Sequence, residues 1–218
     1  MKVKPRPAAR PKGQPKPVLP RLTDLIFVAV SAYLVLNYVL ILLYYVEIPL
    51  LIIREAFNTV YLLMAFALLA IRNRAKTYSG RKRDYAYTIL GFGSPLLFQV
   101  TPQGAGVVIG SALELVGLVF VVSAFLSLNR SFGLAPENRG IKTGGAYSVV
   151  RHPMYLGYIL AEGGYVIDNF SYFNALIFAI SASFLLLRLR AEEQLLQQDR
   201  AYRSYARRTQ WKLLPFVY

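Results

Sequence analysis

The stretch GAGVVIGSALELVGLVFVVSAFLSL, from Gly104 to Leu128, decides the fold class of this chain. It is almost wholly apolar, and it is longer than the about 20 residues that a helix needs to cross a bilayer. Comparable apolar segments occur on both sides of it. Together they predict six membrane-spanning helices, at Leu22 to Tyr45, Ala56 to Ile71, Tyr85 to Gln99, Gly104 to Leu128, Pro153 to Asp168 and Tyr172 to Leu189.

The overall composition agrees with this prediction. The chain is 56% hydrophobic and only 17% charged, whereas about a quarter of the residues in soluble domains are charged. A soluble fold could not bury that much apolar surface. The sequence therefore predicts an all-α, multi-pass membrane protein.

Basic residues gather in alternate loops between the apolar segments. Of the 25 lysines and arginines, 24 lie in the N-terminal tail, in 72–83, in 130–151 or from 188 onward. The loops around Glu47, Gln103 and Asp168 are acidic or neutral instead. Because basic residues mark cytoplasmic loops, this alternation predicts an even number of crossings with both termini in the cytoplasm. It also suggests anionic lipid head groups, rather than nucleic acid, as partners of the basic face.

The chain divides into three predicted regions. Residues 1–21 hold seven basic residues and six prolines without an apolar run, which is typical of a disordered cytoplasmic tail. Residues 22–128 hold the first four predicted helices. Residues 129–218 hold a cytoplasmic loop, helices five and six, and a C-terminal cytoplasmic helix. With no cysteine and a single histidine, His152, the chain offers no thiolate chemistry, and we predict no metal site.

Two features inside the spans invite a functional interpretation. The glycines at 104, 106 and 110 superficially resemble a dinucleotide-binding loop, but Pro102 precedes a membrane span there and not a strand. We predict instead that Gly106 and Gly110 let two helices approach closely. Glu114 is costly within a span unless it faces a partner or water, so a functional role and structural pairing are both open.

The polar stretch Asn129 to His152 is the longest connection predicted to face the cytoplasm, and such loops often carry function. It leads into a helix that we expect to begin at Pro153, where the missing N–H costs nothing. Arg151 and His152 can share one face of that helix with Tyr155. On physical grounds alone, Arg151 could equally mark the membrane edge and Tyr155 the interfacial aromatic belt. The charged run that opens at Arg190 could likewise be a solvated helix face.

The order of motifs narrows these alternatives. Residues 129–216 contain Thr143-Gly144-Gly145-Ala146-Tyr147, then Arg151-His152-Pro153-Met154-Tyr155-Leu156-Gly157, a hydrophobic hairpin, and Arg190-x-Glu192-Glu193 followed by Leu196, Tyr202, Tyr205 and Pro215. This arrangement resembles the isoprenylcysteine carboxyl methyltransferase family. It departs from the family pattern at Gly145-Ala146, where Gly-Pro is common, and at Asp199-Arg200-Ala201, where a Phe-Gly pair is usual. The resemblance implies a methyltransferase that binds S-adenosylmethionine in a pocket open to the cytosol.

The resemblance also implies roles for individual residues. Arg151 and Glu193 would be catalytic, with Arg151 holding the carboxylate of the acceptor. The acceptor would further contact Arg190 and Tyr205. The cofactor would be bound by Gly144, Tyr147, His152, Tyr155, Leu156, Gly157, Glu192 and Glu193. A carboxylate acceptor needs no general base, because it is already ionised near neutral pH, so the site must chiefly align the reacting atoms.

The implied acceptor is lipophilic and enters from the bilayer, the family's type case being the carboxylate of a prenylated cysteine. Three alternatives remain open. Phospholipid amine N-methyltransferases are similar in this C-terminal region, and sterol-type reductases share an Arg-His-Pro-x-Tyr element but bind NADPH. A non-catalytic membrane adaptor would act through its basic tail. In each case we expect a multi-pass protein of the cell membrane or endoplasmic reticulum, with its site facing the cytoplasm.

Overall fold

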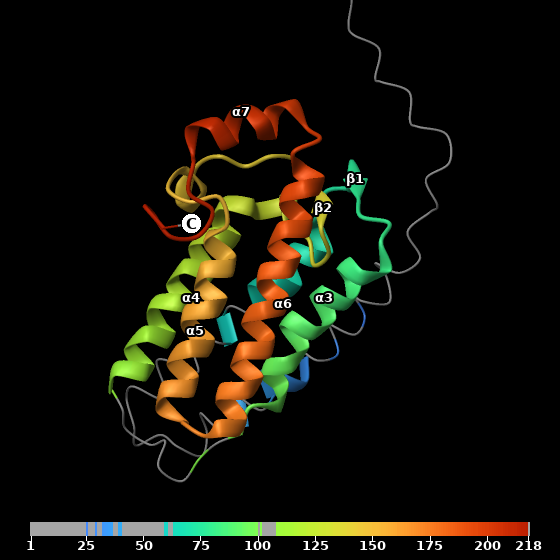
Figure 1. Cartoon of the computed structure of the whole chain (residues 1–218). Helices are drawn as coiled ribbons and strands as arrows, with labels where there is room; N and C mark the ends of the chain where they lie inside the picture. The colour runs from blue at the N-terminus through green and yellow to red at the C-terminus, as the bar shows by residue number, and fades with distance from the viewer. Residues whose placement is uncertain are drawn as a thin grey trace, which may run out of the picture.

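The structure is a computed structural model that describes residues 25, 29, 32–36, 39–40, 59–60, 63–99, 101 and 108–217. This part of the chain is mostly helical, which confirms the predicted helical class (Figure 1). After a helical segment at 63–71, its helices are α3 (Lys82–Gly93), α4 (Val108–Leu128), α5 (Pro153–Asp168), α6 (Tyr172–Leu196) and α7 (Arg200–Arg208). Short 3-10 helices occupy Ser94–Leu97, Asn129–Ser131 and Gly145–Ser148. The strands β1 (Thr77–Tyr78) and β2 (Glu137–Asn138) form one antiparallel pair.

Two of the described helices are long and apolar enough to cross a membrane. They are α4 with the turn that follows it, Val108–Ser131, and α6, with mean hydropathies of 2.2 and 1.7. Along α4, the side chains of Ile109, Val116, Val119 and Leu126 lie on one face and are 48 to 71% exposed. An apolar stripe of this kind is unfavourable in water and suits contact with lipid.

The predicted helix bounds hold in part. α5 has the predicted bounds, and α4 ends at the predicted Leu128. α3 begins before the predicted Tyr85 and gives way to a 3-10 helix at Ser94, because Pro95 cannot supply a helical N–H. Most of the first predicted span lies outside the described residues, whereas 63–71 of the second predicted span is helical. Six crossings and cytoplasmic termini therefore stay predictions.

α4 and α5 pack against each other through pairs of glycines. A Cβ atom on Gly117 would lie 2.5 Å from the Gly157 carbonyl oxygen, and one on Gly164 would lie 2.5 Å from the Gly110 carbonyl oxygen. These contacts confirm that Gly110 allows a close helix approach, while Gly106 lies outside the described residues. Glu114 is buried on the same face of α4, where its backbone faces Gly164.

The basic loops meet at one end of the helix bundle. The Asn73 amide donates to the Arg130 carbonyl at 2.7 Å, and the β1–β2 pair joins the same two segments. The Arg151 amide donates to the Trp211 carbonyl at 2.9 Å, which brings in the C-terminal segment. The segments 72–83, 130–151 and 197–212 thus form one surface, as the charge pattern predicts, and this surface holds the candidate site.

Candidate functional site

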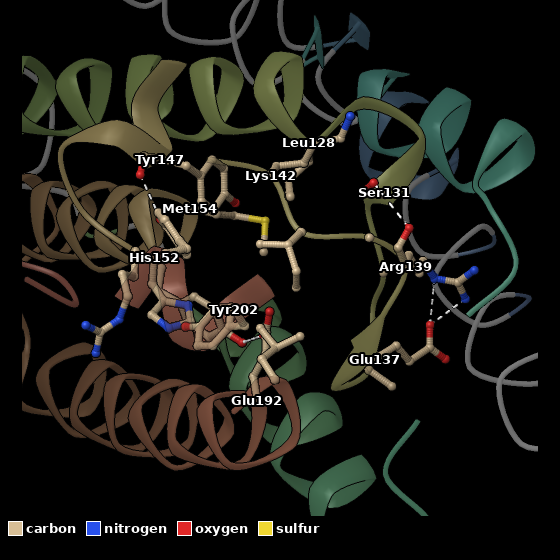
Figure 2. A pocket seen from close by; sticks show the side chains of 18 residues that line it. Leu128, Ser131, Glu137, Arg139, Lys142, Tyr147, His152, Met154, Glu192 and Tyr202 are labelled. Atoms are coloured by element: carbon tan, nitrogen blue, oxygen red, sulfur yellow. Dashed lines mark hydrogen bonds and ion pairs between the residues drawn. The ribbon is translucent and has the colours of Figure 1, made fainter. Parts of the chain in front are cut away.

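A cavity opens at the loop end of the bundle, between the end of α4, the segment 131–142, the start of α5, the end of α6 and α7 (Figure 2). It encloses about 620 Å³ of empty space, part of which is open to solvent. Its lining consists of Leu128, Ser131, Gly133, Ala135, Glu137, Arg139, Gly140, Ile141, Lys142, Tyr147, Arg151, His152, Met154, Tyr155, Glu192, Leu196, Tyr202 and Tyr205.

The structure brings about half of the predicted site residues to this cavity. Those that line it are Tyr147, Arg151, His152, Tyr155, Glu192 and Tyr205. The others lie beside it or away from it, and they are Gly144, Leu156, Gly157, Arg190 and Glu193. Functional roles for both groups stay predictions.

Arg151 and Glu193 form a buried ion pair with each other. Arg151 Nε donates to Glu193 Oε1 at 2.9 Å and Nη2 donates to Oε2 at 3.3 Å, while the two side chains are 8 and 7% exposed. Arg151 Nη1 donates to the backbone carbonyls of Thr209 and Gln210. Four of the five guanidinium N–H groups are therefore engaged within the protein. In this conformation Arg151 has one N–H left and could not grip an acceptor carboxylate bidentately.

The Glu193 carboxylate joins three elements of the fold. Besides Arg151, its Oε1 accepts from His152 Nε2 at 2.8 Å and from the Tyr202 hydroxyl at 2.5 Å. Its Oε2 also accepts a long hydrogen bond from Gln197. An ionised carboxylate offers about four lone-pair sites, and these donors fill them. Glu193 thereby holds the start of α5 and α7 to the end of α6, and its own contacts leave little capacity for a ligand.

Glu192 is the α6 carboxylate that lines the cavity. The Tyr155 hydroxyl donates to Glu192 Oε2 at 2.5 Å, and the rings of Tyr155 and His152 meet edge to face at 5.5 Å. In Figure 2, Glu192, Tyr202, His152 and Tyr147 gather at one end of the cavity. The predicted Glu192–Glu193 pair is thus divided, with one carboxylate on the cavity wall and one in the protein interior.

Tyrosines from two elements close this end of the cavity. The Tyr205 hydroxyl donates to the Tyr147 carbonyl at 2.7 Å and so fixes the loop that precedes α5. Burial raises the pKa of the Tyr147 phenol well above its usual value, and the nearby Glu192 charge raises it further. Burial raises the pKa of Tyr202 and of Tyr205 as well. All three phenols are therefore neutral hydrogen-bonding groups near neutral pH.

The opposite end of the cavity carries an ion pair that the sequence did not indicate. Glu137 and Arg139 are joined to each other there, as Figure 2 shows. Between them, Asn138 donates to Asp199 at 2.9 Å and ties β2 to the start of α7. This hydrogen bond lowers the pKa of the Asp199 carboxyl. Glu137 and Arg139 are only two residues apart in the sequence, but it is the fold that places them on the cavity, so their spacing alone did not indicate a site.

The remaining predicted residues serve packing or face solvent. Gly157 is held against α4, where its Cβ would lie 2.6 Å from the Gly117 carbonyl oxygen. Leu156 is buried within the core, whereas Gly144 and Arg190 are exposed. On α6 the buried arginine is Arg188, one helical turn before Glu192.

The predicted C-terminal helix differs in its bounds and contributions. The run from Arg190 to Leu196 continues α6, because Ala191 and Leu195 remain buried on its inner face. The chain then turns, and Asp199 begins α7 by accepting from the Ala201 amide at 2.8 Å. Glu193 therefore comes from α6, and the separate helix α7 supplies Tyr202 and Tyr205 instead.

Comparison with known proteins points to methyl transfer. The profile of the phospholipid methyltransferase family matches residues 105–203, which run from the start of α4 into α7 and include most of the cavity. No curated protein matches the chain. The matched family is related to the isoprenylcysteine carboxyl methyltransferases. The match and the apolar helices together indicate a membrane methyltransferase, similar from α4 into α7 to phospholipid methyltransferases.

Proposed function

We propose that this protein transfers a methyl group from S-adenosylmethionine to a lipid-like acceptor at the cytoplasmic surface of a membrane. The observation that carries the proposal is the convergence of Tyr147, His152, Tyr155 and Glu192 on one cavity. These residues come from two motifs that lie about 40 residues apart, and the cavity falls within the region matched by the phospholipid methyltransferase family. The adjacent apolar helices would present the same site to a lipid.

The side chains around the cavity fit S-adenosylmethionine. When bound, this cofactor supplies an electrophilic methyl group on a cationic sulfur. Glu192 can accept hydrogen bonds from its ammonium or hydroxyl groups. The tyrosine rings offer faces that attract a cation and stack on a base. Lys142, which also lines the cavity, supplies positive charge for a carboxylate.

Two acceptors are supported by different observations. The phospholipid methyltransferase match favours a phospholipid amine, and so does the internal pairing of Arg151 with Glu193. An amine arrives as an ammonium ion and must lose a proton before it attacks. The Glu192 carboxylate lies on the cavity wall, where it can accept a hydrogen bond from the ammonium group and then its proton. The order of the sequence motifs supports the second candidate, the carboxylate of a prenylated cysteine.

Calorimetric titration of the purified full chain in detergent tests the cofactor. We expect S-adenosylhomocysteine, the demethylated product, to bind at one site per chain, and NADPH not to bind. Glu192→Gln, which keeps the size of the side chain but removes its charge, should weaken binding about tenfold or more. If neither S-adenosylhomocysteine nor S-adenosylmethionine binds, the proposed methyltransferase activity is excluded. Saturable binding of NADPH in their place would favour the reductase alternative.

Methyl transfer to defined lipids tests the acceptor. With S-adenosylmethionine labelled on its methyl group, we expect label in vesicles that contain phosphatidylethanolamine. The label should stay non-volatile after mild alkali, because the N-methyl bond survives even where the acyl esters of the phospholipid hydrolyse. A methyl ester would instead hydrolyse and release volatile methanol. Alkali-labile label on a farnesylated cysteine, with none in the phospholipid, would assign the carboxylate acceptor instead.

A further inference from the structure

Arg188 is a buried cation beside the site. Its side chain is 1% exposed, and it lies on α6, one of the two helices long enough to cross a membrane. No carboxylate within the described part of the chain lies within 4 Å of it. A buried charge is costly unless it is hydrogen-bonded or otherwise compensated. The contacts of Arg188 therefore require an explanation.

The Arg188 guanidinium donates its hydrogen bonds to neutral groups. Nε donates to the Thr88 hydroxyl at 3.2 Å, and Nη2 donates to the Leu134 carbonyl at 2.6 Å. Nη1 donates to the Tyr155 hydroxyl at 2.6 Å. The rings of Phe92 and Tyr155 lie against it, with centroids 4.9 and 5.0 Å from Cζ. A hydrogen-bonded route from this cation to a carboxylate runs through the Tyr155 hydroxyl, which in turn contacts Glu192.

The direction of the hydrogen bonds along this route is fixed by chemistry. A guanidinium can only donate, so the Tyr155 oxygen must accept from Arg188. The single proton of the hydroxyl is then directed to Glu192 Oε2, 2.5 Å away. A hydroxyl polarised by a cation on one side binds a carboxylate more strongly on the other. Glu192 is thereby held at Oε2, and Oε1 remains for other partners.

We infer that Arg188 is a positioning residue that fixes the Tyr155 hydroxyl and, through it, the ligand-binding carboxylate of Glu192. Arg188 does not line the cavity, so it acts without touching the ligand. The inference rests on the proposed function, because it assigns Glu192 to the cofactor. The contact of Arg188 with the Leu134 carbonyl also joins α6 to the segment 131–142, which forms another wall of the cavity.

The geometry requires an arginine rather than any cation. A lysine ammonium is a single point of charge on a flexible stem, and it could not reach Thr88, Tyr155 and Leu134 together in the planar arrangement of a guanidinium. Arg188→Lys keeps the buried charge but should release Tyr155. Tyr155→Phe keeps the ring but removes the hydroxyl that links the cation to Glu192.

A double-mutant cycle in the full chain tests the inference, with the affinity for S-adenosylhomocysteine measured by calorimetry. We expect Arg188→Lys and Tyr155→Phe each to weaken binding about tenfold, the effect of losing a hydrogen bond to a charged group. The double variant should bind about as weakly as either single variant, because both changes break one chain of contacts. The control is Arg207→Lys on the exposed face of α7, which should bind as the wild type does.

The outcomes separate the inference from the proposed function. Additive losses in the double variant, or unchanged affinity of Tyr155→Phe, would overturn the positioning role while leaving the methyltransferase proposal intact. A wild-type chain that fails to bind S-adenosylhomocysteine would overturn both. If Arg188→Lys does not yield monodisperse protein, Tyr155→Phe tests the link to Glu192 from its other end, since it removes one oxygen and leaves the packing in place.

Discussion

Replacing Arg151 with glutamine is expected to destabilise the protein by about 3–5 kcal/mol, the usual effect of removing one partner from a buried ion pair. Glu193 would remain buried with its charge uncompensated, although His152 and Tyr202 would still donate to it. The carbonyls of Thr209 and Gln210 would also lose their donor, which loosens the C-terminal segment from the start of α5. Thermal unfolding of the purified chain in detergent measures the effect as a lower midpoint.

A matched control distinguishes burial from charge alone. Arg83 also pairs with a carboxylate, that of Asp84, at 3.6 Å, but its side chain is 59% exposed. The Asp84 side chain is buried, but it keeps its closer partner Arg81, at 3.0 Å. Ion pairs with an exposed partner contribute about 0–1 kcal/mol, so Arg83→Gln should leave the midpoint nearly unchanged. Equal effects in the two variants would mean that the Arg151 pair is not a structural centre. Restoration of stability by the double change Arg151→Leu with Glu193→Leu would confirm that the uncompensated charge causes the loss.

The buried pairing of Arg151 with Glu193 favours a structural role for Arg151 over the acceptor-binding role that the sequence motifs imply. The spacing predicts that Arg151 and Tyr155 share one helix face. In the structure both line one cavity, but Arg151 precedes α5, which begins at Pro153. The direction of the Arg151 side chain could not be predicted. It depends on Glu193, which is far away in sequence, and on backbone carbonyls after α7 that no side-chain pattern indicates.

The fold itself was predictable where the chain is periodic and locally determined. Apolar length places α4 and α6, and Pro153 places the start of α5. The sequence could not show that α6 continues past the apolar segment to Leu196, since the charged residues after Leu189 are typical of a solvated helix. That continuation depends on partners from other elements, among them His152 and Tyr202, which make Glu193 a buried position.

The same dependence on tertiary contacts explains why the sequence pattern indicates Arg190 and not Arg188 as a site residue. Both arginines precede the two glutamates, and the motif spacing gives no reason to separate them. The structure separates them, because side chains two positions apart on an α-helix point in directions about 200° apart. Arg188 consequently faces α3 and α5, where Thr88 and Tyr155 meet it, while Arg190 is exposed.

The second large effect is expected from Gly157→Val, which should prevent α4 and α5 from packing. Even the Cβ atom would lie 2.6 Å from the Gly117 carbonyl oxygen and 2.8 Å from the Val121 amide nitrogen. Both are backbone atoms, so the helices must move apart and no side chain can relieve the contact. Overpacking commonly costs about 1–3 kcal/mol and sometimes more, and here the displaced helix also carries His152 and Tyr155. We expect little monodisperse protein after purification and no measurable affinity for S-adenosylhomocysteine.

Gly163→Ala on the same helix provides the control for this effect. An added Cβ there would meet only the Phe178 ring, at 3.6 Å, which is ordinary van der Waals contact. Alanine is favoured over glycine within a helix by about 1 kcal/mol, so this variant should be as stable as the wild type or slightly more so. A Gly157→Val protein that unfolds at the wild-type temperature would show that α4 and α5 do not need their close approach. A loss in Gly163→Ala alone would instead assign the constraint to the α5–α6 face.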